Sequence, residues 1–157
     1  MVPYFLSKER QESLFEIFES WVGTPSRHRG GAVKGLGADC VSFVHESLKE
    51  SGGMEGMKVN FPADADYPRD RALHSKEEVL LEVLRLIPEF REYNKRTKPI
   101  NGDICCYQFG LSTSHFALYY GGRIYHSLTR TEVHRTRFDE AKYLNRLTAI
   151  FRLMEKL

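Results

Sequence analysis

One cysteine stands where a covalent nucleophile is expected. Cys40 follows a glycine-rich approach and begins a predicted helix over residues 40–51. Unpaired backbone N–H groups and the helix dipole favour an anion at that end, so we expect the pKa of the thiol to be lowered. A thiolate is the form of cysteine that attacks carbonyl carbons. The competing interpretation is a buried, inert cysteine, which is common for a free thiol.

Two histidines follow in the strongest hairpin of the sequence, whose two-residue turn is the Gly-Gly pair at 121–122. This turn brings Ala117 opposite His126, and His115 shares the face of Ala117 because side chains alternate along a strand. The two histidines then become diagonal neighbours about 7 Å apart. If the helix that begins at Cys40 packs on that face, the three residues stand in the order nucleophile, base and orienting group. Taken singly, each histidine is more simply interpreted as a core or surface residue.

Helices are predicted in the first half of the chain, and one of them must position Cys40 relative to the two histidines. A helix is predicted over 7–21, and its apolar face consists of Leu14, Phe15, Phe18 and Trp21. The helix over 40–51 begins after Asp39, whose carboxylate suits the N-cap position. A third helix is predicted over 75–86, and residues 88–99 read as a charged surface connection.

Strands dominate the second half. They are predicted at 104–109, 115–120, 123–127, 132–137 and 147–153. Cys105 and Cys106 fall on opposite faces of the first of these strands. Helices followed by a mainly antiparallel sheet over 103–153 predict an α+β fold in which the N-terminal helices pack on the sheet. At 157 residues, the chain reads as a single domain, 1–157.

Composition argues against several classes of partner. Hydrophobic residues make up 41% of the chain and charged residues 28%, with a formal net charge of +2. That charge is too small to indicate nucleic acid or an anionic membrane as a partner. No apolar run reaches the length of a membrane span. Residues 1–10 are too charged for a signal peptide, which leaves the location open between the cytoplasm and a cell wall reached by way of a particle.

The three cysteines do not predict a disulfide framework, because their number is odd and two of them are adjacent. A zinc site would need these cysteines together with histidines, and the sequence has no CxxC or HxxxH pair to support one. We therefore expect no metal and no cofactor.

Three blocks of the sequence, in order, resemble the NlpC-type cell-wall cysteine peptidases, a papain-like family. The first block spans 21–41 and contains Gly-Thr-Pro and Asp-Cys. The second is Asn-Gly-Asp-Ile at 101–104, and the third is His-Phe-Ala-Leu-Tyr at 115–119 with Ile-Tyr-His at 124–126. Tyr-Pro-Arg-Asp at 67–70 further resembles the branch of the family found in phage tails and related particles.

The resemblance implies a papain-like core and a hydrolase that cuts peptidoglycan stem peptides next to a D-glutamyl residue. Cys40 is then the nucleophile, His115 shuttles the proton and His126 orients His115. The backbone amide of Cys40 is the expected oxyanion donor. The implied partners are a peptidoglycan peptide or another small peptide or acyl substrate, together with phage-tail or wall-associated proteins.

Two departures from the family pattern concern the substrate. Ser26 stands where the family often has a tyrosine after Gly-Thr-Pro, and His28 is close enough in sequence to take over its role. Val41 and Ser42 replace the small residue and glycine that usually follow the cysteine. We expect Ser26, His28 and Asp39 to contact the substrate. The alternatives are a papain-like amidase or acyltransferase acting on a substrate outside the wall, and a non-catalytic assembly module.

Overall fold

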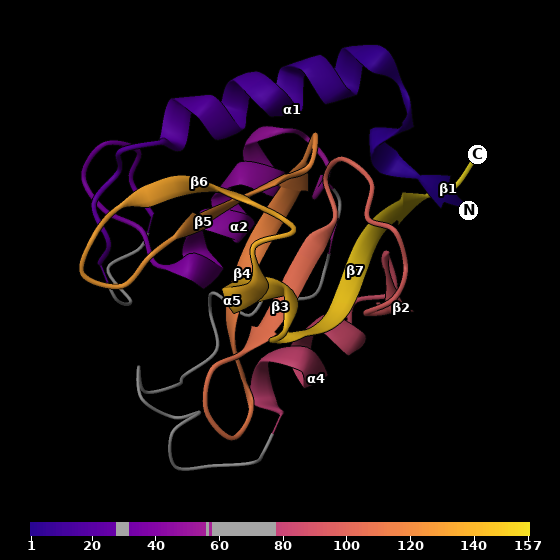
Figure 1. The fold of residues 1–157 in the computed structure, drawn as a ribbon. Helices are drawn as coiled ribbons and strands as arrows, with labels where there is room; N and C mark the ends of the chain where they lie inside the picture. Colours follow the sequence, from indigo (N-terminus) through magenta and orange to yellow (C-terminus); the bar gives the residue numbers. More distant parts are fainter. Residues whose placement is uncertain (28–31, 56, 58–77) are drawn as a thin grey trace.

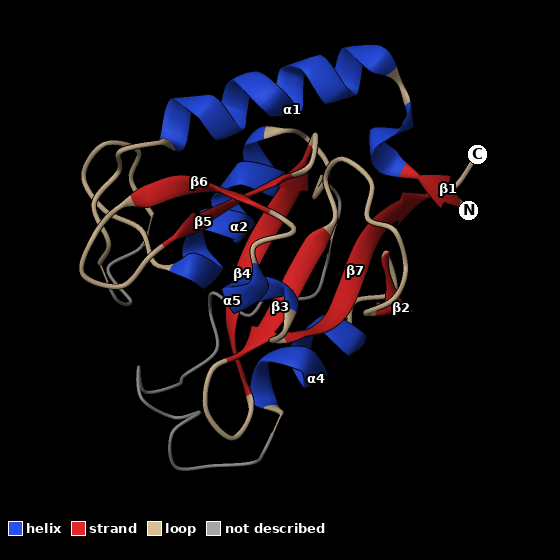
Figure 2. Ribbon diagram, viewed as in Figure 1, coloured by secondary structure: helices blue, strands red, loops and turns tan. Residues whose placement is uncertain are grey.

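The structure, a computed structural model, describes residues 1–27, 32–55, 57 and 78–157. Its elements, in chain order, are β1 (Val2–Pro3), the 3-10 helix η1 (Tyr4–Leu6), α1 (Lys8–Trp21), α2 (Cys40–Glu50), α4 (Val79–Arg85), β2 (Phe90–Asn94), β3 (Ile104–Gln108), β4 (Thr113–Tyr120), β5 (Arg123–Ser127), β6 (Val133–Arg137), α5 (Ala141–Leu144) and β7 (Leu147–Glu155) (Figure 1). The strands pair antiparallel in the order β1-β7-β3-β4-β5-β6, and β2 also pairs with β7. The predicted α+β fold is confirmed (Figure 2).

The two faces of the sheet carry separate cores. Phe116 and Leu118 of β4 point into the larger core, which buries the apolar faces of α1, α2 and α4. Ala117, between them, points into the smaller core, which is closed by Tyr143 of α5. In Figure 1, α5 therefore lies in front of the strands, whereas α2 lies behind β4 and β5. Side-chain alternation along the strands thus assigns α2 and α5 to opposite faces.

Helix α1 follows the prediction except on one edge of its apolar face. Ser7 is the N-cap, and its hydroxyl accepts a hydrogen bond from the amide of Arg10 at 3.2 Å. Phe15 was predicted to be in the core, but it is 42% exposed, with its ring against Tyr120. Ile17 is buried in its place, because helical spacing puts it nearer the centre of the stripe formed by the other three predicted residues.

The prediction of a surface connection over 88–99 is wrong, because these residues contain β2. Its pairing with β7 runs from Phe90 opposite Leu153 to Asn94 opposite Ala149. Phe90 is buried, and the exposed charges that follow it are typical of a strand at the edge of a sheet. Those charges concealed the strand in the sequence. The sheet consequently extends beyond the predicted region, and the short β1 pairs with the end of β7 as well.

The third predicted helix is present in its second half as α4, and residues 75–77 lie outside the described residues. The five predicted strands correspond to β3, β4, β5, β6 and β7. In the part of the chain that the structure describes, no helix combines the length and apolar character needed to cross a membrane.

A buried ion pair fixes the start of β3. Both oxygens of the Asp103 carboxylate accept from the Arg152 guanidinium, at 2.9 and 2.8 Å, and one also accepts from the amide of Ile100. Asp103 is only 1% exposed, so burial raises its pKa while Arg152 acts in the opposite direction. Gly102 before it has a φ of +95°, and a Cβ there would lie 2.2 Å from the Phe5 ring. Only glycine suits this position.

Candidate active site

Cys40 occupies the first position of α2, as predicted. The carboxylate of Asp39 accepts from the amide of Ser42 at 2.7 Å, and the hydroxyl of Ser42 accepts from the amide of Asp39 at 2.9 Å. This reciprocal capping box fixes the direction in which the chain enters the helix. Asp39 and Ser42 therefore hold the backbone on both sides of the thiol.

The hairpin of β4 and β5 has the predicted register next to its turn. Both glycines of the turn, 121–122, have positive φ values of 55° and 84°, as a type I′ turn requires. Leu118 lies opposite Tyr125, as predicted. Among the described residues of the two strands, the pairing ends there, and the predicted pairing of Ala117 with His126 is wrong.

Residues 38–40, at the start of α2, form hydrogen bonds with both β4 and β5 at the point where these two strands stop pairing. The hydroxyl of Ser127 on β5 donates to the carbonyl of Ala38 at 2.8 Å. On the β4 side, the Cys40 thiol donates to the carbonyl of Ser114 at 3.7 Å, and the backbone amide of Phe116 lies against the same sulfur. These contacts take the place of pairing between β4 and β5. They place the thiol beside the backbone of Ser114 and Phe116, the residues on either side of His115.

The histidines project from the face of the sheet opposite to α2. Phe116 points toward α2, whereas the ring of His115 lies 6.0 Å from that of Tyr107 and 6.3 Å from that of Tyr143, both in the smaller core. The condition set for the ordered triad, that the Cys40 helix packs on the histidine face, is therefore not met, because the apolar stripe of α2 is buried in the larger core. Cys40 contacts the backbone of Ser114 and Phe116, on either side of His115, where β4 and β5 part.

His115 and His126, hereafter the histidine pair, are joined by a hydrogen bond. Nε2 of His115 lies 2.7 Å from Nδ1 of His126, and the ring centroids are 5.0 Å apart. On the other side of its ring, His126 has Nε2 2.7 Å from Oγ1 of Thr136 on β6. His126 is fully buried and His115 is half-buried. The second ring is thus held at both nitrogens, and Nδ1 is the nitrogen of His115 that His126 does not engage.

Aromatic side chains enclose the histidine pair on the α5 side. The ring of Tyr143 lies 4.9 Å from that of His126 in an edge-on arrangement. Phe109 also meets the ring of His115 edge-on, at 5.9 Å. These contacts limit the access of water to both imidazoles, so the hydrogen bond between them lies in a medium of low polarity.

The expected lowering of the Cys40 pKa is wrong. Burial raises the pKa of the thiol to about 12, and the negative charge of Asp39 acts in the same direction. The backbone amides of Phe116, Cys40 and Val41 lower the pKa, as the helix-start argument anticipated, but their effect is smaller. The thiol is therefore protonated at neutral pH when no substrate is bound.

The histidine pair is uncharged at neutral pH for the same reason. Burial lowers the pKa of His115 to about 4, and the positive charge of Lys142 on α5 adds to this effect. Burial lowers the pKa of His126 further, to about 2, with contributions from His115, His134 and Lys142. Two neutral imidazoles can share one hydrogen bond only if one ring donates and the other accepts.

The remaining predicted site residues have different positions relative to the thiol. The amide of Ser26 donates to the carbonyl of Thr131 at 2.9 Å, and Ser26 forms a parallel bridge with Ala38. Ser26 is therefore part of the approach to Cys40. His28 lies outside the described residues, as do residues 67–70.

Cys105 and Cys106 are buried on opposite faces of β3, as predicted, and burial raises the pKa of both thiols. Within the described ranges, no group of three or more His, Cys, Asp or Glu side chains is arranged to hold a metal ion.

Sequence reasoning missed Thr136 and Tyr143. Thr136 lies in a predicted strand, and the observed register sets His126 opposite His134, so Thr136 is a diagonal neighbour of His126 on the same face. The length of the β5–β6 connection did not fix that register in advance. Tyr143 belongs to a helix of four residues, which is too short to show a periodic pattern.

Comparison with solved structures identifies the fold as NlpC-type. An NlpC/P60 family protein from Bacillus cereus ATCC 10987 matches with a TM-score of 0.60 at 20% identity, over 92% of this chain and 40% of that chain. A protein described as similar to a lipoprotein of the NLP/P60 family, from Staphylococcus aureus subsp. aureus Mu50, matches with a TM-score of 0.63 at 14% identity, over 98% and 44%. The NlpC/p60 domain of the peptidoglycan hydrolase SagA matches with a TM-score of 0.52 at 13% identity, over 92% and 98%.

These likenesses confirm the predicted NlpC-type, papain-like fold, and at such identities they concern the fold alone. The chain spans less than half the length of the first two proteins. No sequence-family model matches the chain, and no curated protein does. The relation to the phage-tail branch stays a prediction.

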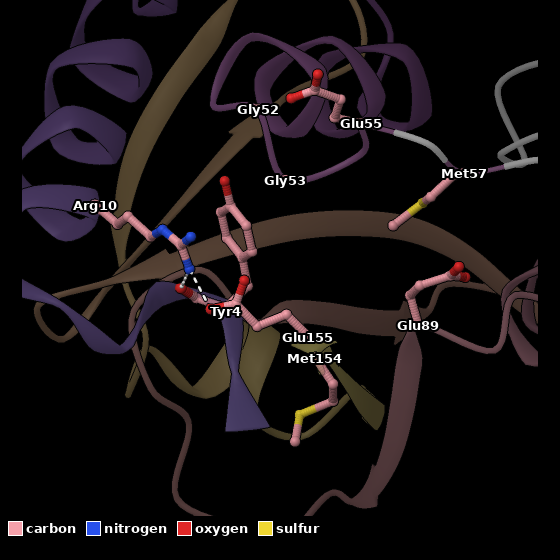
Figure 3. A pocket seen from close by; sticks show the side chains of 9 residues that line it. All are labelled: Tyr4, Arg10, Gly52, Gly53, Glu55, Met57, Glu89, Met154 and Glu155. Carbon is pink, nitrogen blue, oxygen red and sulfur yellow. Dashed lines mark hydrogen bonds and ion pairs between the residues drawn. The ribbon is translucent and has the colours of Figure 1, made fainter. Parts of the chain in front are cut away.

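A separate cavity of about 370 Å³ lies at the other end of α2 (Figure 3). Its lining consists of Tyr4, Arg10, Gly52, Gly53, Glu55, Met57, Glu89, Met154 and Glu155. The two glycines follow the eleven residues of α2, which puts the cavity roughly 16 Å along the helix axis from Cys40. Arg10 is engaged there by Glu155 and by the carbonyl and ring of Tyr4. This cavity is not part of the site around the thiol.

Proposed function

We propose that this protein is a cysteine hydrolase that cleaves an amide bond in peptidoglycan stem peptides, next to a D-glutamyl residue. The observation that carries the proposal is the 2.7 Å contact between His115 Nε2 and His126 Nδ1, on a strand whose neighbouring residues Ser114 and Phe116 contact the Cys40 thiol through their backbone. Burying two imidazoles that resist protonation is costly, and such costs concentrate at functional sites. The NlpC-type fold supports the same reaction class, since one protein with this fold is named a peptidoglycan hydrolase.

Acylation begins from a neutral thiol and a neutral base. As the Cys40 sulfur attacks the scissile carbonyl carbon, its proton passes to Nδ1 of His115 and a carbon–sulfur bond forms. The backbone amide of Cys40 stabilises the oxyanion. His115 then gives the proton to the departing nitrogen, and the carbon–nitrogen bond breaks. His126 accepts from Nε2 of His115 and so keeps the base in one orientation.

Deacylation reverses the roles. His115 takes a proton from a water molecule, which attacks the thioester carbon, and the proton returns to the Cys40 sulfur as the carbon–sulfur bond breaks. The acid product leaves with the free thiol regenerated. Because Cys40 and His115 are both uncharged before substrate binds, the proton is transferred during the attack on the carbonyl carbon and not before it.

A second candidate keeps the site and changes the substrate: an amidase or acyltransferase acting outside the wall. Ser26 favours it, because a hydroxyl on the approach to Cys40 cannot supply the contacts of the tyrosine that the family often has there. An acyltransferase would release the acyl group to an amine or alcohol instead of water.

The test is digestion of purified muropeptides by the native protein, Cys40→Ala and Cys105→Ala, read by mass spectrometry. Native protein and Cys105→Ala should cleave, because Cys105 is a buried thiol on β3 with no role in the proposed proton transfer. Cys40→Ala should lose a factor on the order of 10⁴ or more in rate. The fragment masses identify the bond.

Equal cleavage by native protein and Cys40→Ala would refute covalent catalysis. No cleavage of muropeptides, combined with Cys40-dependent release of nitrophenol from simple acyl esters, would favour the second candidate. No Cys40-dependent turnover of either substrate would favour the non-catalytic assembly module.

A further inference from the structure

We infer that Thr136 is a positioning residue that sets the tautomer of His126 and, through it, the tautomer of His115. The inference rests on the proposed function, because the tautomer of His115 matters for catalysis only if this residue accepts a proton from Cys40. Thr136 lies behind the histidine pair on β6, with one ring between it and the proposed base.

The sheet register brings the hydroxyl to the ring. His126 of β5 lies opposite His134 of β6, and Thr136 lies opposite Ile124. The hydroxyl is therefore a diagonal neighbour of His126, with Oγ1 2.7 Å from Nε2. Because His126 is fully buried, each ring nitrogen needs a partner within the protein. His115 and Thr136 supply those partners.

Only one arrangement of hydrogens leaves His115 able to act as a base. In the productive arrangement, Nε2–H of His115 donates to Nδ1 of His126, and Nε2–H of His126 donates to Oγ1 of Thr136. Nδ1 of His115 then carries a lone pair. In the opposite arrangement, Thr136 donates to His126 and His126 donates to His115, whose Nδ1 then carries a hydrogen and cannot accept the thiol proton.

Two considerations favour the productive arrangement. A free imidazole side chain prefers the Nε2–H tautomer, and both rings have it in this arrangement. Thr136 is half-buried, so its hydroxyl can accept from His126 and direct its own hydrogen elsewhere. Without the hydroxyl, Nε2 of His126 is left unpaired in either tautomer, so the hydrogen bond that favours the productive arrangement over the opposite one is lost. The opposite tautomer would then gain population.

The experiment compares native protein with Thr136→Val, Thr136→Ser and Thr148→Val. Valine has the shape of threonine but no hydroxyl, and serine restores the hydroxyl. Thr148 is the matched control, because its hydroxyl bonds to Thr113 and to the carbonyl of Cys106 on other strands. Long-range proton–nitrogen NMR correlations report which ring nitrogen of each histidine carries a hydrogen, and muropeptide digestion gives kcat and KM.

Native protein, Thr136→Ser and Thr148→Val should all have hydrogen on Nε2 of both histidines. Thr136→Val should populate the other tautomer and lose roughly ten- to a hundredfold in kcat, with KM nearly unchanged, because the buried hydrogen bond that selects the productive tautomer is lost.

A native His126 with hydrogen on Nδ1, or an unchanged tautomer in Thr136→Val, would overturn the inference. The NMR measurement needs no substrate. A failure of muropeptide cleavage therefore counts against the proposed function alone, and a wrong tautomer counts against the role of Thr136 alone.

Discussion

Alkylation of Cys40 by iodoacetamide should be slow at neutral pH and should accelerate about tenfold with each pH unit between 7 and 10. Alkylation requires the thiolate, and burial raises the pKa of this thiol to about 12. His115 cannot stabilise the thiolate as an imidazolium at neutral pH, because burial lowers the pKa of that ring to about 4. Before substrate binds, Cys40 is therefore a thiol and His115 a neutral imidazole.

The expected rate follows from two opposing factors. At pH 7, a pKa of about 12 leaves a thiolate fraction of about 10⁻⁵, against about 3 × 10⁻² for a free cysteine with a pKa of about 8.5. This ratio of roughly 3,000 is partly offset, because a more basic thiolate is more nucleophilic; with a Brønsted coefficient of about 0.45, the offset is roughly 40-fold. Cys40 should therefore react about a hundredfold more slowly than a free cysteine.

The assay follows the labelled Cys40 peptide by mass spectrometry across pH in folded protein. Asp39→Asn is the informative variant, since asparagine keeps an oxygen that can cap α2 and removes the charge that raises the thiol pKa. Its rate should exceed the native rate at every pH. Cys105 and Cys106 are internal controls, because both are fully buried and should react only after unfolding.

A rate that stays constant between pH 5 and 8, and equals or exceeds that of a free cysteine, would refute this reasoning. Such a plateau would mean that a thiolate–imidazolium pair exists before substrate binds. Slow alkylation cannot separate an enzyme from a non-catalytic module. Turnover is needed for that.

Other perturbations test stability. The free energy of unfolding should fall by about 2–3 kcal/mol for each histidine of the pair, about 5–6 kcal/mol in all, in urea titrations as the pH decreases from 6.5 to 4, because unfolded histidines bind protons below 6.5 while the histidine pair stays largely neutral; a flat profile would contradict the assigned pKa values. Arg152→Met should lower the free energy of unfolding by about 3–5 kcal/mol, because the Asp103 carboxylate is left buried without its ion partner, and adding Asp103→Asn should restore part of the loss. Gly102→Ala should cost more than about 1 kcal/mol, because positive φ and contact with Phe5 combine there. Gly35→Ala, with positive φ but no neighbouring atom within 4 Å of the added Cβ, should cost less; equal losses would remove the role of the Phe5 contact.

The parts of the fold with a regular local signal could be predicted from the sequence. The start of α2 has a capping residue followed by an apolar stripe, and the β4–β5 turn has two glycines, so both were identified with nearly correct bounds. β2 could not be found in the same way, because its outward side chains are charged and only Phe90 is buried at its start. Its identity depends on β7, which lies far along the chain.

The contact within the histidine pair was predictable from the sequence, whereas its position relative to Cys40 was not. Side-chain alternation put His115 and His126 on one face, and they do meet there, although the pairing of Ala117 with His126 used to predict this is absent. The ionisation of Cys40 was not predictable, because burial depends on the contacts of the Ala38–Cys40 segment with two strands, whereas the helix-start effect is local. Thr136 required the β5–β6 register, which no turn signal fixes.

The most direct test of the central claim is peptide mapping of the protein quenched in acid during turnover of a muropeptide. We expect the acyl fragment to be attached to Cys40 in native protein and its amount to reach a steady level, and we expect Cys40→Ala neither to carry the fragment nor to cleave the substrate. Continued cleavage by Cys40→Ala, or an acyl fragment on any other residue, would rule out Cys40 as the nucleophile.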